Sequence, residues 1–272
     1  MALAAALLLS VSCTYPTVPE NAALVKANKQ QVAFFDRPVA IAAAQASGTP
    51  YPVIVMLSAN PWLPVVGSDS PTFALYSDGT AIFQTKDGFR SIQLSRDEQD
   101  EMIRVFENPD LVALAGGYEV SESTDQPNNS LLFYGSKTPL YISVYGDLHD
   151  EEVRAKLPQT VIAAFDRLRD FQPPNAQAWL PSEVEVMAWP YEYAPDRSII
   201  WPERWPDLTA DTTRKRGDSY SIFVASTELP ALEKFLASRS QRGAIEISGK
   251  KLAASIRLPF PHESLWMAPK TD

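Results

Sequence analysis

The densest group of side chains that could do acid–base chemistry is Asp147, His149, Asp150, Glu151 and Glu152. Histidine changes its protonation state near neutral pH, and neighbouring carboxylates can orient its ring. In one interpretation His149, assisted by Asp147 or Asp150, is a general base or a metal ligand. In the alternative, which we favour, the acidic residues open a helix, because the amides of its first turn attract negative charge, and His149 is a loop residue.

The second histidine, His262, is followed by Glu263 near the end of the sequence. If folding brought His262 to Asp147 and His149, the three would form a site with two imidazoles and a carboxylate. Nothing in the sequence indicates that they meet, so an exposed tail segment is the simpler interpretation. Asp147, His149 and His262 are therefore weak candidates for a catalytic centre.

Other catalytic and cofactor motifs are missing from the sequence. Cys13 is the single cysteine, which excludes a disulfide within the chain and a metal site built from a cysteine cluster. The sequence has no Gly-x-Ser-x-Gly nucleophile elbow, no Walker loop and no Gly-x-Gly-x-x-Gly motif. We expect no cofactor and no metal, and an enzyme is the less favoured class.

The most distinctive stretch of the chain is residues 179–205, which are rich in tryptophan, tyrosine and proline. Large flat rings can stack on sugars or anchor a protein partner at low entropic cost. The alternative, which we favour for most of these rings, is that they fill a loop-rich core and wedge two lobes together. In the binding interpretation the contact residues are Trp189, Tyr191, Trp201 and Trp205.

The N-terminal residues have the pattern of an export signal. Residues 2–9 form an uninterrupted apolar run, and Ser12 and Cys13 follow shortly after it. Such a run matches the hydrophobic core of a signal peptide, about 7–15 residues, and is far shorter than the roughly 20 residues that span a bilayer. Residues 1–13 resemble the signal peptide of a bacterial lipoprotein, in which small residues precede the cysteine that receives the lipid.

That resemblance has consequences for localisation. It implies lipidation of Cys13, so that acyl chains would anchor the protein to the membrane without spanning it. Because the non-acidic Thr14 follows, it also implies sorting to the periplasmic face of the outer membrane. The resemblance covers the signal alone and implies nothing about activity.

The rest of the chain is predicted to be α+β, with antiparallel meanders and hairpins packed against helices. At 45% hydrophobic and 21% charged residues the chain can bury a core. Runs of strands mixed with single helices favour α+β over a doubly wound sheet. We expect a tether and entry segment at 14–50, a first lobe at 51–172 and a second lobe at 181–263, with the Trp- and Pro-rich loop inside the second lobe.

In the first lobe, turn and cap residues mark the ends of the predicted strands and helices. Two Asp-Gly pairs divide residues 72–94 into three β-rich segments, which predicts a meander after a buried strand at 53–57. Ser95 and Glu98 form a capping box for a helix that runs to about Glu107. The lobe continues with strands at 131–134 and 140–145 around a Gly135-Ser136-Lys137 turn, and with helical residues from 150 to 170 that Pro158 divides.

In the second lobe we predict a strand at 184–189, a polar loop at 214–218 and a strand at 220–225. A helix at 227–238 follows because Leu229, Leu232 and Leu236 fall on one face. Before both lobes, Pro38 is expected to interrupt an alanine-rich segment that could otherwise be helical. A final hairpin joins 244–248 to 252–258.

Charge narrows the possible partners. The formal net charge of −9 argues against binding of nucleic acid, or of anionic lipid, through a broad basic face. The leading hypothesis is a non-catalytic, lipid-anchored cell-envelope protein that binds another protein or a wall component. One form of it is an inhibitor- or immunity-like protein, whose acidic surface would steer a basic partner. The alternative is an envelope hydrolase that uses His149 with nearby carboxylates.

Overall fold

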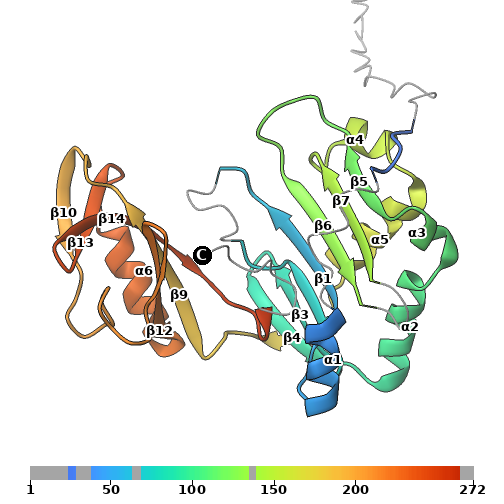
Figure 1. Cartoon of the computed structure of the whole chain (residues 1–272), viewed down its shortest axis with the longest axis horizontal. Helices are drawn as coiled ribbons and strands as arrows, with labels where there is room; N and C mark the ends of the chain where they lie inside the picture. The colour runs from blue at the N-terminus through green and yellow to red at the C-terminus, as the bar shows by residue number, and fades with distance from the viewer. Residues whose placement is uncertain (1–23, 29–37, 63–68, 135–138, 264–272) are drawn as a thin grey trace, which may run out of the picture.

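The chain is α+β, and its two open sheets lie side by side with helices against one face of each (Figure 1). The computed structural model describes residues 24–28, 38–62, 69–134 and 139–263. Cys13 and the predicted Gly135-Ser136-Lys137 turn lie outside these residues. Within them, no helix is both long and apolar enough to cross a bilayer.

The first sheet has eight strands in the order β5-β7-β6-β1-β2-β3-β4-β8. Its neighbours pair antiparallel, apart from β5 and β7, which are parallel. The predicted buried strand, the meander and the hairpin are confirmed as β1, β2–β4 and β6–β7. The strands are β1 (Pro52–Ala59), β2 (Phe73–Tyr76), β3 (Thr80–Thr85), β4 (Gly88–Gln93), β5 (Gly116–Glu119), β6 (Asn128–Phe133), β7 (Leu140–Tyr145) and β8 (Gln177–Ala178).

The turn between β2 and β3 requires glycine at position 79. Gly79 has a φ of 89°, and a Cβ added there would lie 2.7 Å from the Leu94 carbonyl oxygen. The Asp78 carboxylate accepts a hydrogen bond from the Thr80 amide at 3.0 Å. The Asp-Gly pair therefore fixes this turn through backbone conformation and a local side-chain hydrogen bond.

Caps define the helices of the first lobe. The Ser95–Glu98 capping box is confirmed, since each side chain accepts a hydrogen bond from the other residue's backbone amide. The Asp150 carboxylate caps the next acidic helix by accepting from the Glu152 amide at 2.8 Å. Pro158 separates two helices as predicted, whereas Pro38 begins a helix, because the first helical position needs no amide donor. The helices are α1 (Pro38–Ser47), α2 (Arg96–Phe106), α3 (Pro109–Ala113), α4 (Glu151–Ala155) and α5 (Gln159–Arg169).

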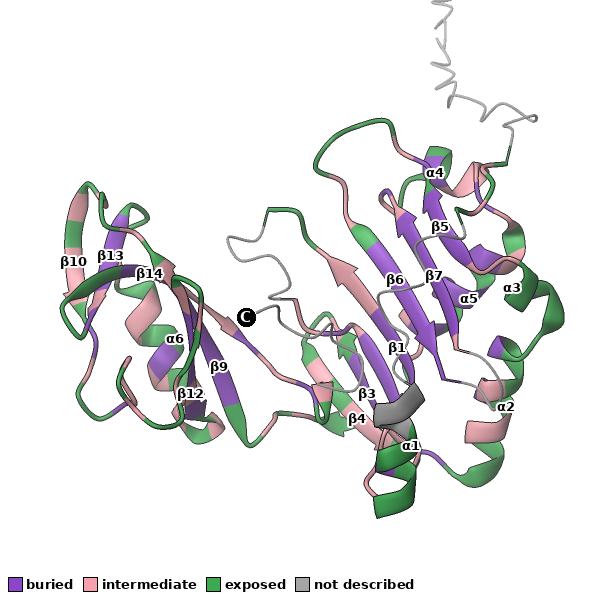
Figure 2. Cartoon of the chain, viewed as in Figure 1, coloured by how far each residue is buried: buried purple, intermediate pink, exposed green. Residues whose placement is uncertain are grey.

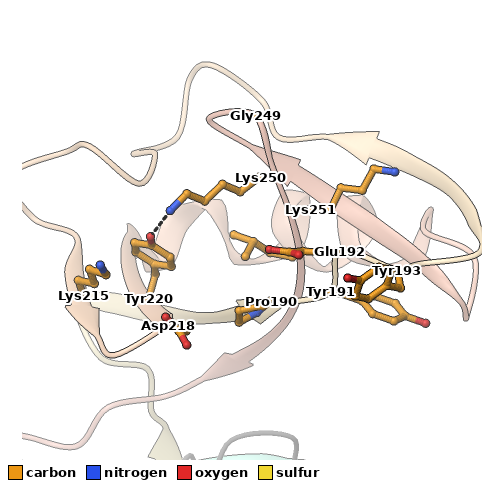
Figure 3. A pocket seen from close by; sticks show the side chains of 11 residues that line it. Pro190, Tyr191, Glu192, Tyr193, Lys215, Asp218, Tyr220, Gly249, Lys250 and Lys251 are labelled. Carbon is orange, nitrogen blue, oxygen red and sulfur yellow. Dashed lines mark hydrogen bonds between the residues drawn. The ribbon is translucent and has the colours of Figure 1, made fainter.

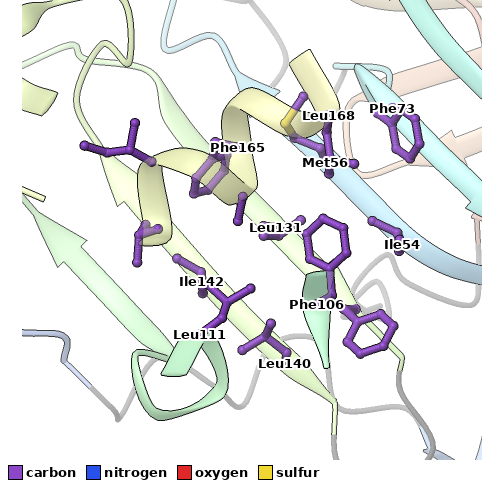
Figure 4. Packing of buried hydrophobic residues seen from close by; sticks show 14 of the residues in the cluster. Ile54, Met56, Phe73, Phe106, Leu111, Leu131, Leu140, Ile142, Phe165 and Leu168 are labelled. Carbon is purple, nitrogen blue, oxygen red and sulfur yellow. The ribbon is translucent and has the colours of Figure 1, made fainter. Parts of the chain in front are cut away.

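Alternation along the strands buries both faces of the first sheet. On β2, Phe73 and Leu75 face the large core under the helices, while Ala74 and Tyr76 face a smaller cluster behind the sheet. Figure 4 shows Phe165 and Leu168 of α5 against the strand residues of the large core. Figure 2 shows the central strands buried along most of their length. Successive side chains of a strand point to opposite faces of the sheet, so this strand contributes to an apolar layer on each face.

The second sheet has six strands in the order β10-β13-β14-β9-β12-β11. The predicted strand, helix and hairpin are confirmed, but residues 214–218 are not a simple polar loop, because residues 214–216 pair with β12. The Trp- and Pro-rich loop likewise contains a strand, β10, which pairs parallel with β13. The elements are β9 (Glu183–Pro190), β10 (Asp196–Ile200), β11 (Arg214–Arg216), β12 (Ser219–Ala225), η2 (Ser226–Glu228), α6 (Leu229–Ala237), β13 (Gly243–Ile247) and β14 (Lys250–Arg257).

The chain returns to the first sheet after β14. Phe260 enters the cluster behind that sheet, where its ring meets Phe89 and Trp179 edge-on at centroid distances of 5.2 and 5.0 Å. The Tyr76 hydroxyl donates to the Pro261 carbonyl at 2.9 Å. Residues 258–263 therefore form a strap that ties the second sheet to the first.

The strap gives the first prediction. Phe260→Ala should lower the free energy of unfolding by about 3 kcal/mol, because it removes a buried ring and leaves a cavity. Val105→Ala on the exposed side of α2 is the control and should change it by less than about 0.5 kcal/mol. Urea unfolding followed by circular dichroism measures both. A loss for Phe260→Ala no larger than the control's would show that the strap does not stabilise the fold.

Candidate functional site

Two of the four predicted contact residues lie inside the second lobe. Trp201 and Trp205 are 5% and 4% exposed, and both rings pack against Phe235 of α6. Their indole N–H groups donate to the Pro206 carbonyl and the Glu228 carboxylate, respectively. The expectation that these two rings face a partner is therefore corrected: they pack on α6 and fill the core of this lobe.

The other two predicted residues lie near the end of β9. Trp189 is half-buried on the strand, opposite Ala253 of β14. Tyr191 follows the strand and its amide donates to the Lys251 carbonyl at 2.9 Å. Tyr191 lines an open hollow beside this end of β9.

That hollow has a volume of about 920 Å³ and lies at one end of the second sheet (Figure 3). Its side chains come from the chain leaving β9 and from strands β11, β12 and β14. Tyr193, at its rim, is 92% exposed. We call it the lysine–tyrosine hollow, after Tyr191, Tyr193, Tyr220, Lys215, Lys250 and Lys251.

Two tight hairpins carry the lysines to this end of the sheet. Ser248 and Gly249, with φ of 49° and 76°, form the two-residue turn between β13 and β14, so Lys250 starts the next strand. Gly217, with φ of 58°, and Asp218 turn the chain between β11 and β12. Both turns have the positive φ that tight hairpins require, and β9 ends beside them because it is antiparallel to β12 and β14.

The charges of the lysine–tyrosine hollow are unevenly paired. Lys250 donates to the Tyr220 hydroxyl at 2.6 Å. For Lys215 and Lys251, the described part of the chain provides no hydrogen-bonding or ionic partner to the ammonium group. Glu192 and Asp218 also line the hollow, and Figure 3 shows Glu192 between the tyrosine pair and Lys250. Two ammonium groups are thus left to bind an anion from solution.

Sequence reasoning missed most of this hollow. Tyr193, Lys215, Lys250 and Lys251 stand in three separate segments, none of which forms a motif. They meet because β14 and β12 flank β9, and no periodicity in the sequence reveals that strand order. The usable signal was the pair of glycine turns next to lysines, since such turns end strands at the same edge.

His149 and Asp147 line a different hollow of about 640 Å³ between α5 and the first sheet. The Asp147 carboxylate accepts a hydrogen bond from the His149 backbone amide at 2.9 Å, which makes a turn just before α4. Among the described carboxylates, none is hydrogen-bonded to the His149 ring, which is exposed. This geometry agrees with a loop residue ahead of a capped helix.

His262 does not join His149 and Asp147. It lies in the strap, exposed, with a φ of 57°, and it does not line the hollow beside α5. The described ranges also contain no group of three or more His, Cys, Asp or Glu side chains that could hold a metal ion. The weak catalytic candidates are therefore spread over two places, and an oriented base, which nucleophilic catalysis needs, is not formed.

A buried charge cluster lies on β9 and β14 toward the strap, and its Arg216 is the chain neighbour of Lys215 in the lysine–tyrosine hollow. Arg257, whose side chain is 4% exposed, pairs with Glu185 at 2.8 Å and with Glu263 of the strap. Arg216 reaches the second oxygen of Glu185 at 3.2 Å. The Arg257 Nε donates to the Asp69 carbonyl at 3.3 Å. The cluster therefore links strands β9, β11 and β14 of the second sheet to the strap and to the loop between β1 and β2.

The cluster keeps Glu185 ionised. Burial tends to raise the pKa of Glu185, but the adjoining Ser221 hydroxyl and the Arg257 and Arg216 guanidinium groups outweigh burial and hold it below its ordinary value. Burial likewise acts against the charge of Arg257, and the two carboxylates overcome it, so the pKa of Arg257 is raised.

Comparison with known proteins adds no relative. No protein-family model, no curated protein and no solved structure matches this chain. Its function must therefore be argued from its own residues.

The buried cluster gives the second prediction. Arg257→Leu should destabilise the fold by about 3–5 kcal/mol, because it leaves the Glu185 carboxylate buried without its main partner. Arg96→Leu, which removes an exposed ion pair with Asp100, is the control and should cost less than about 1 kcal/mol.

The same cluster gives a pH prediction. A carboxylate with a depressed folded-state pKa stabilises the fold above its unfolded value, near 4.3, and this stabilisation is lost as the pH falls through the folded-state pKa. Asp69, whose pKa burial raises, acts in the opposite sense. Unfolding free energies from pH 7 to 3 should therefore fall less steeply in Glu185→Gln than in the parent. Equal slopes would contradict the assignment.

Proposed function

We propose that this protein is a non-catalytic, lipid-anchored cell-envelope protein that binds another protein or a wall component through the lysine–tyrosine hollow. The observation that carries the proposal is that this hollow combines the exposed Tyr193 ring, beside the half-buried Tyr191, with two unpaired ammonium groups. Flat rings provide contact area at low entropic cost. Unpaired ammonium groups can form ion pairs with anionic groups of a partner.

The distance between the chain's entry and the hollow supports this proposal. Residues 24–28 lie beside the β5 edge, where Asn28 bridges to Gly117 and the Val25 amide donates to the Lys156 carbonyl. Figure 1 shows that edge on the far side of the molecule from the second sheet. The hollow lies at the end of β9 and β14 remote from the strap, about 25 Å along the strands. The first described residues and the hollow therefore lie at opposite ends of the molecule.

The local charge of the hollow differs in sign from the net charge of the chain. The formal net charge of the whole chain is −9. The hollow holds three lysines against Glu192 and Asp218, a local excess of one positive charge (3 − 2). Such a local reversal gives selectivity, because the rest of the surface repels anions.

The alternative hydrolase is less well supported than binding. It would use His149 with Asp147, yet Asp147 binds a backbone amide and His262 lies elsewhere. The hollow beside α5 remains a place where a small ligand could sit, but it brings no oriented base to the ligand.

The anchor is tested by Cys13→Ala. Because acyl chains on Cys13 would provide all of the membrane attachment, the variant should move from the membrane fraction to the soluble envelope fraction. Ser12→Ala, which keeps a small residue before the cysteine, is the control and should stay with the membranes. The measurement is immunodetection after fractionation. A Cys13→Ala protein that still fractionates with membranes would refute the anchor.

Binding is tested by the double variant Tyr191→Ala/Tyr193→Ala. The tagged full chain in mild detergent is used to capture material from envelope protein extract and, separately, from insoluble wall material. Loss of both rings should weaken capture at least tenfold, about 1.4 kcal/mol. Trp62→Ala removes another exposed ring, on the first lobe, and should leave capture unchanged. If the double variant and the parent capture equal amounts from both sources, the hollow is not the binding surface.

A further inference from the structure

We infer that the ligand of the lysine–tyrosine hollow is a carboxylated glycan, a short run of sugar rings that carry carboxylate groups. The inference rests on the proposed binding function and names its ligand class. It follows from which groups line the hollow, how they are spaced and which of them are already paired.

The tyrosines provide the sugar-binding face. Figure 3 shows Tyr191 and Tyr193 next to each other at one end of the hollow, with Tyr220 at the other. The Tyr193 ring is almost fully exposed, whereas Tyr191 is held by the hydrogen bond from its amide to Lys251. Exposed flat rings bind the apolar faces of sugar rings, so the stacking place is the end that holds Tyr191 and Tyr193. Tyr220 is buried, with the Lys250 ammonium group over its ring, and closes the other end of the hollow.

The lysines indicate carboxylates on that ligand. Figure 3 shows Lys215 at the Tyr220 end and Lys251 at the end that holds the tyrosine pair, with the Lys251 ammonium group directed away from the rings. The two unpaired ammonium groups therefore lie at different ends of the hollow. Lys250 is already bound to the Tyr220 hydroxyl. Separate cations call for separate anionic groups spaced along the ligand, rather than for a single phosphate.

The acidic side chains exclude a dense polyanion and favour hydroxyl groups. Glu192 lies between the lysines and Asp218 lies beside Lys215, so a ligand charged along its whole length would meet repulsion. Ionised carboxylates are acceptors only, and sugar hydroxyls are the matching donors. A ligand with both hydroxyl donors and spaced carboxylates satisfies all the charged groups of this hollow.

The volume agrees with an oligosaccharide. About 920 Å³ is near the upper end of ligand-sized hollows and accommodates several sugar rings. The hollow has no deep apolar hole for a side chain, because its apolar walls are Pro190, Leu252 and the tyrosine rings themselves. An acidic peptide, which would need such a hole for an anchor residue, fits less well.

The test uses isothermal titration of the full chain, in detergent, with four defined probes. Tetragalacturonic acid carries a carboxylate on each ring, and its methyl ester keeps the rings without the charge. Tetra-N-acetylglucosamine is a neutral glycan, and tetraglutamate is a carboxylated peptide. We expect the acid to bind at least tenfold more tightly than each of the other three, and its affinity to fall with added salt.

Matched variants locate the site. Lys215→Gln/Lys251→Gln should weaken binding of tetragalacturonic acid at least tenfold. Lys86→Gln/Lys234→Gln removes the same charge from exposed positions outside the hollow and should leave binding unchanged. Thermal unfolding of each variant confirms that it remains folded.

The outcomes separate this inference from the proposal beneath it. Equal binding of the ester or of the neutral glycan would overturn the need for carboxylates, and equal binding of tetraglutamate would overturn the glycan in favour of an acidic protein. Binding of none of the probes, with the tyrosine-dependent capture intact, would overturn the ligand class and leave the proposed function standing. Loss of that capture as well would remove both.

Discussion

The arrangement of the two sheets depends on a buried ion cluster centred on Arg257. A guanidinium that is 4% exposed is tolerated only because Glu185, Glu263 and a backbone carbonyl surround it. These partners come from the second sheet, the strap and the loop between β1 and β2, so the charges can all be satisfied in one relative placement of the three. Phe260 then buries an aromatic ring behind the first sheet at the same junction. The electrostatic requirement sets the geometry, and burial of the ring stabilises it.

The strap holds the second sheet at the end where β14 finishes, and the opposite end, where β14 begins, is exposed. The strands β9 and β14 are each eight residues long, and the hollow lies at the end away from the strap. Arg216 of the cluster adjoins Lys215 of the hollow on β11, so the cluster also fixes that side of the hollow. The core of this lobe is apolar, with Val184, Val186 and Ala188 of β9 in one buried cluster with Leu232 of α6. A rigid sheet that is held at one end presents side chains at the other end in fixed positions. Pre-positioned groups bind with a smaller loss of conformational entropy than groups on a mobile loop.

Local patterns predicted local structure well, and the site poorly. The Asp-Gly turns, the Ser95–Glu98 box and the Pro158 break each carry a physical mechanism within a few residues, and each is confirmed. The parallel strands β5 and β10 were missed, because Gly116-Gly117 and the residues around Pro195 lack an alternating pattern and their partners are distant in sequence. The hollow was missed for the same reason: it is made by strand order. The resemblance of residues 1–13 to a lipoprotein signal stays a prediction, since those residues lie outside the described structure.

The tryptophans that were expected to face a partner support the hollow indirectly. Trp201 and Trp205 anchor the loop after β10 against Phe235, and the same loop then reaches Asp207. The Asp207 carboxylate accepts hydrogen bonds from the Thr209 hydroxyl and amide and from the Ser248 hydroxyl, and these bonds hold its pKa below the ordinary range. Ser248 is the first residue of the turn that places Lys250 at the hollow. Packing of Trp201 and Trp205 therefore positions the loop after β10, and the hydrogen bond between Asp207 and Ser248 connects this loop to the turn that precedes Lys250. This explains why a stretch so rich in tryptophan and proline can serve binding while hiding its largest rings.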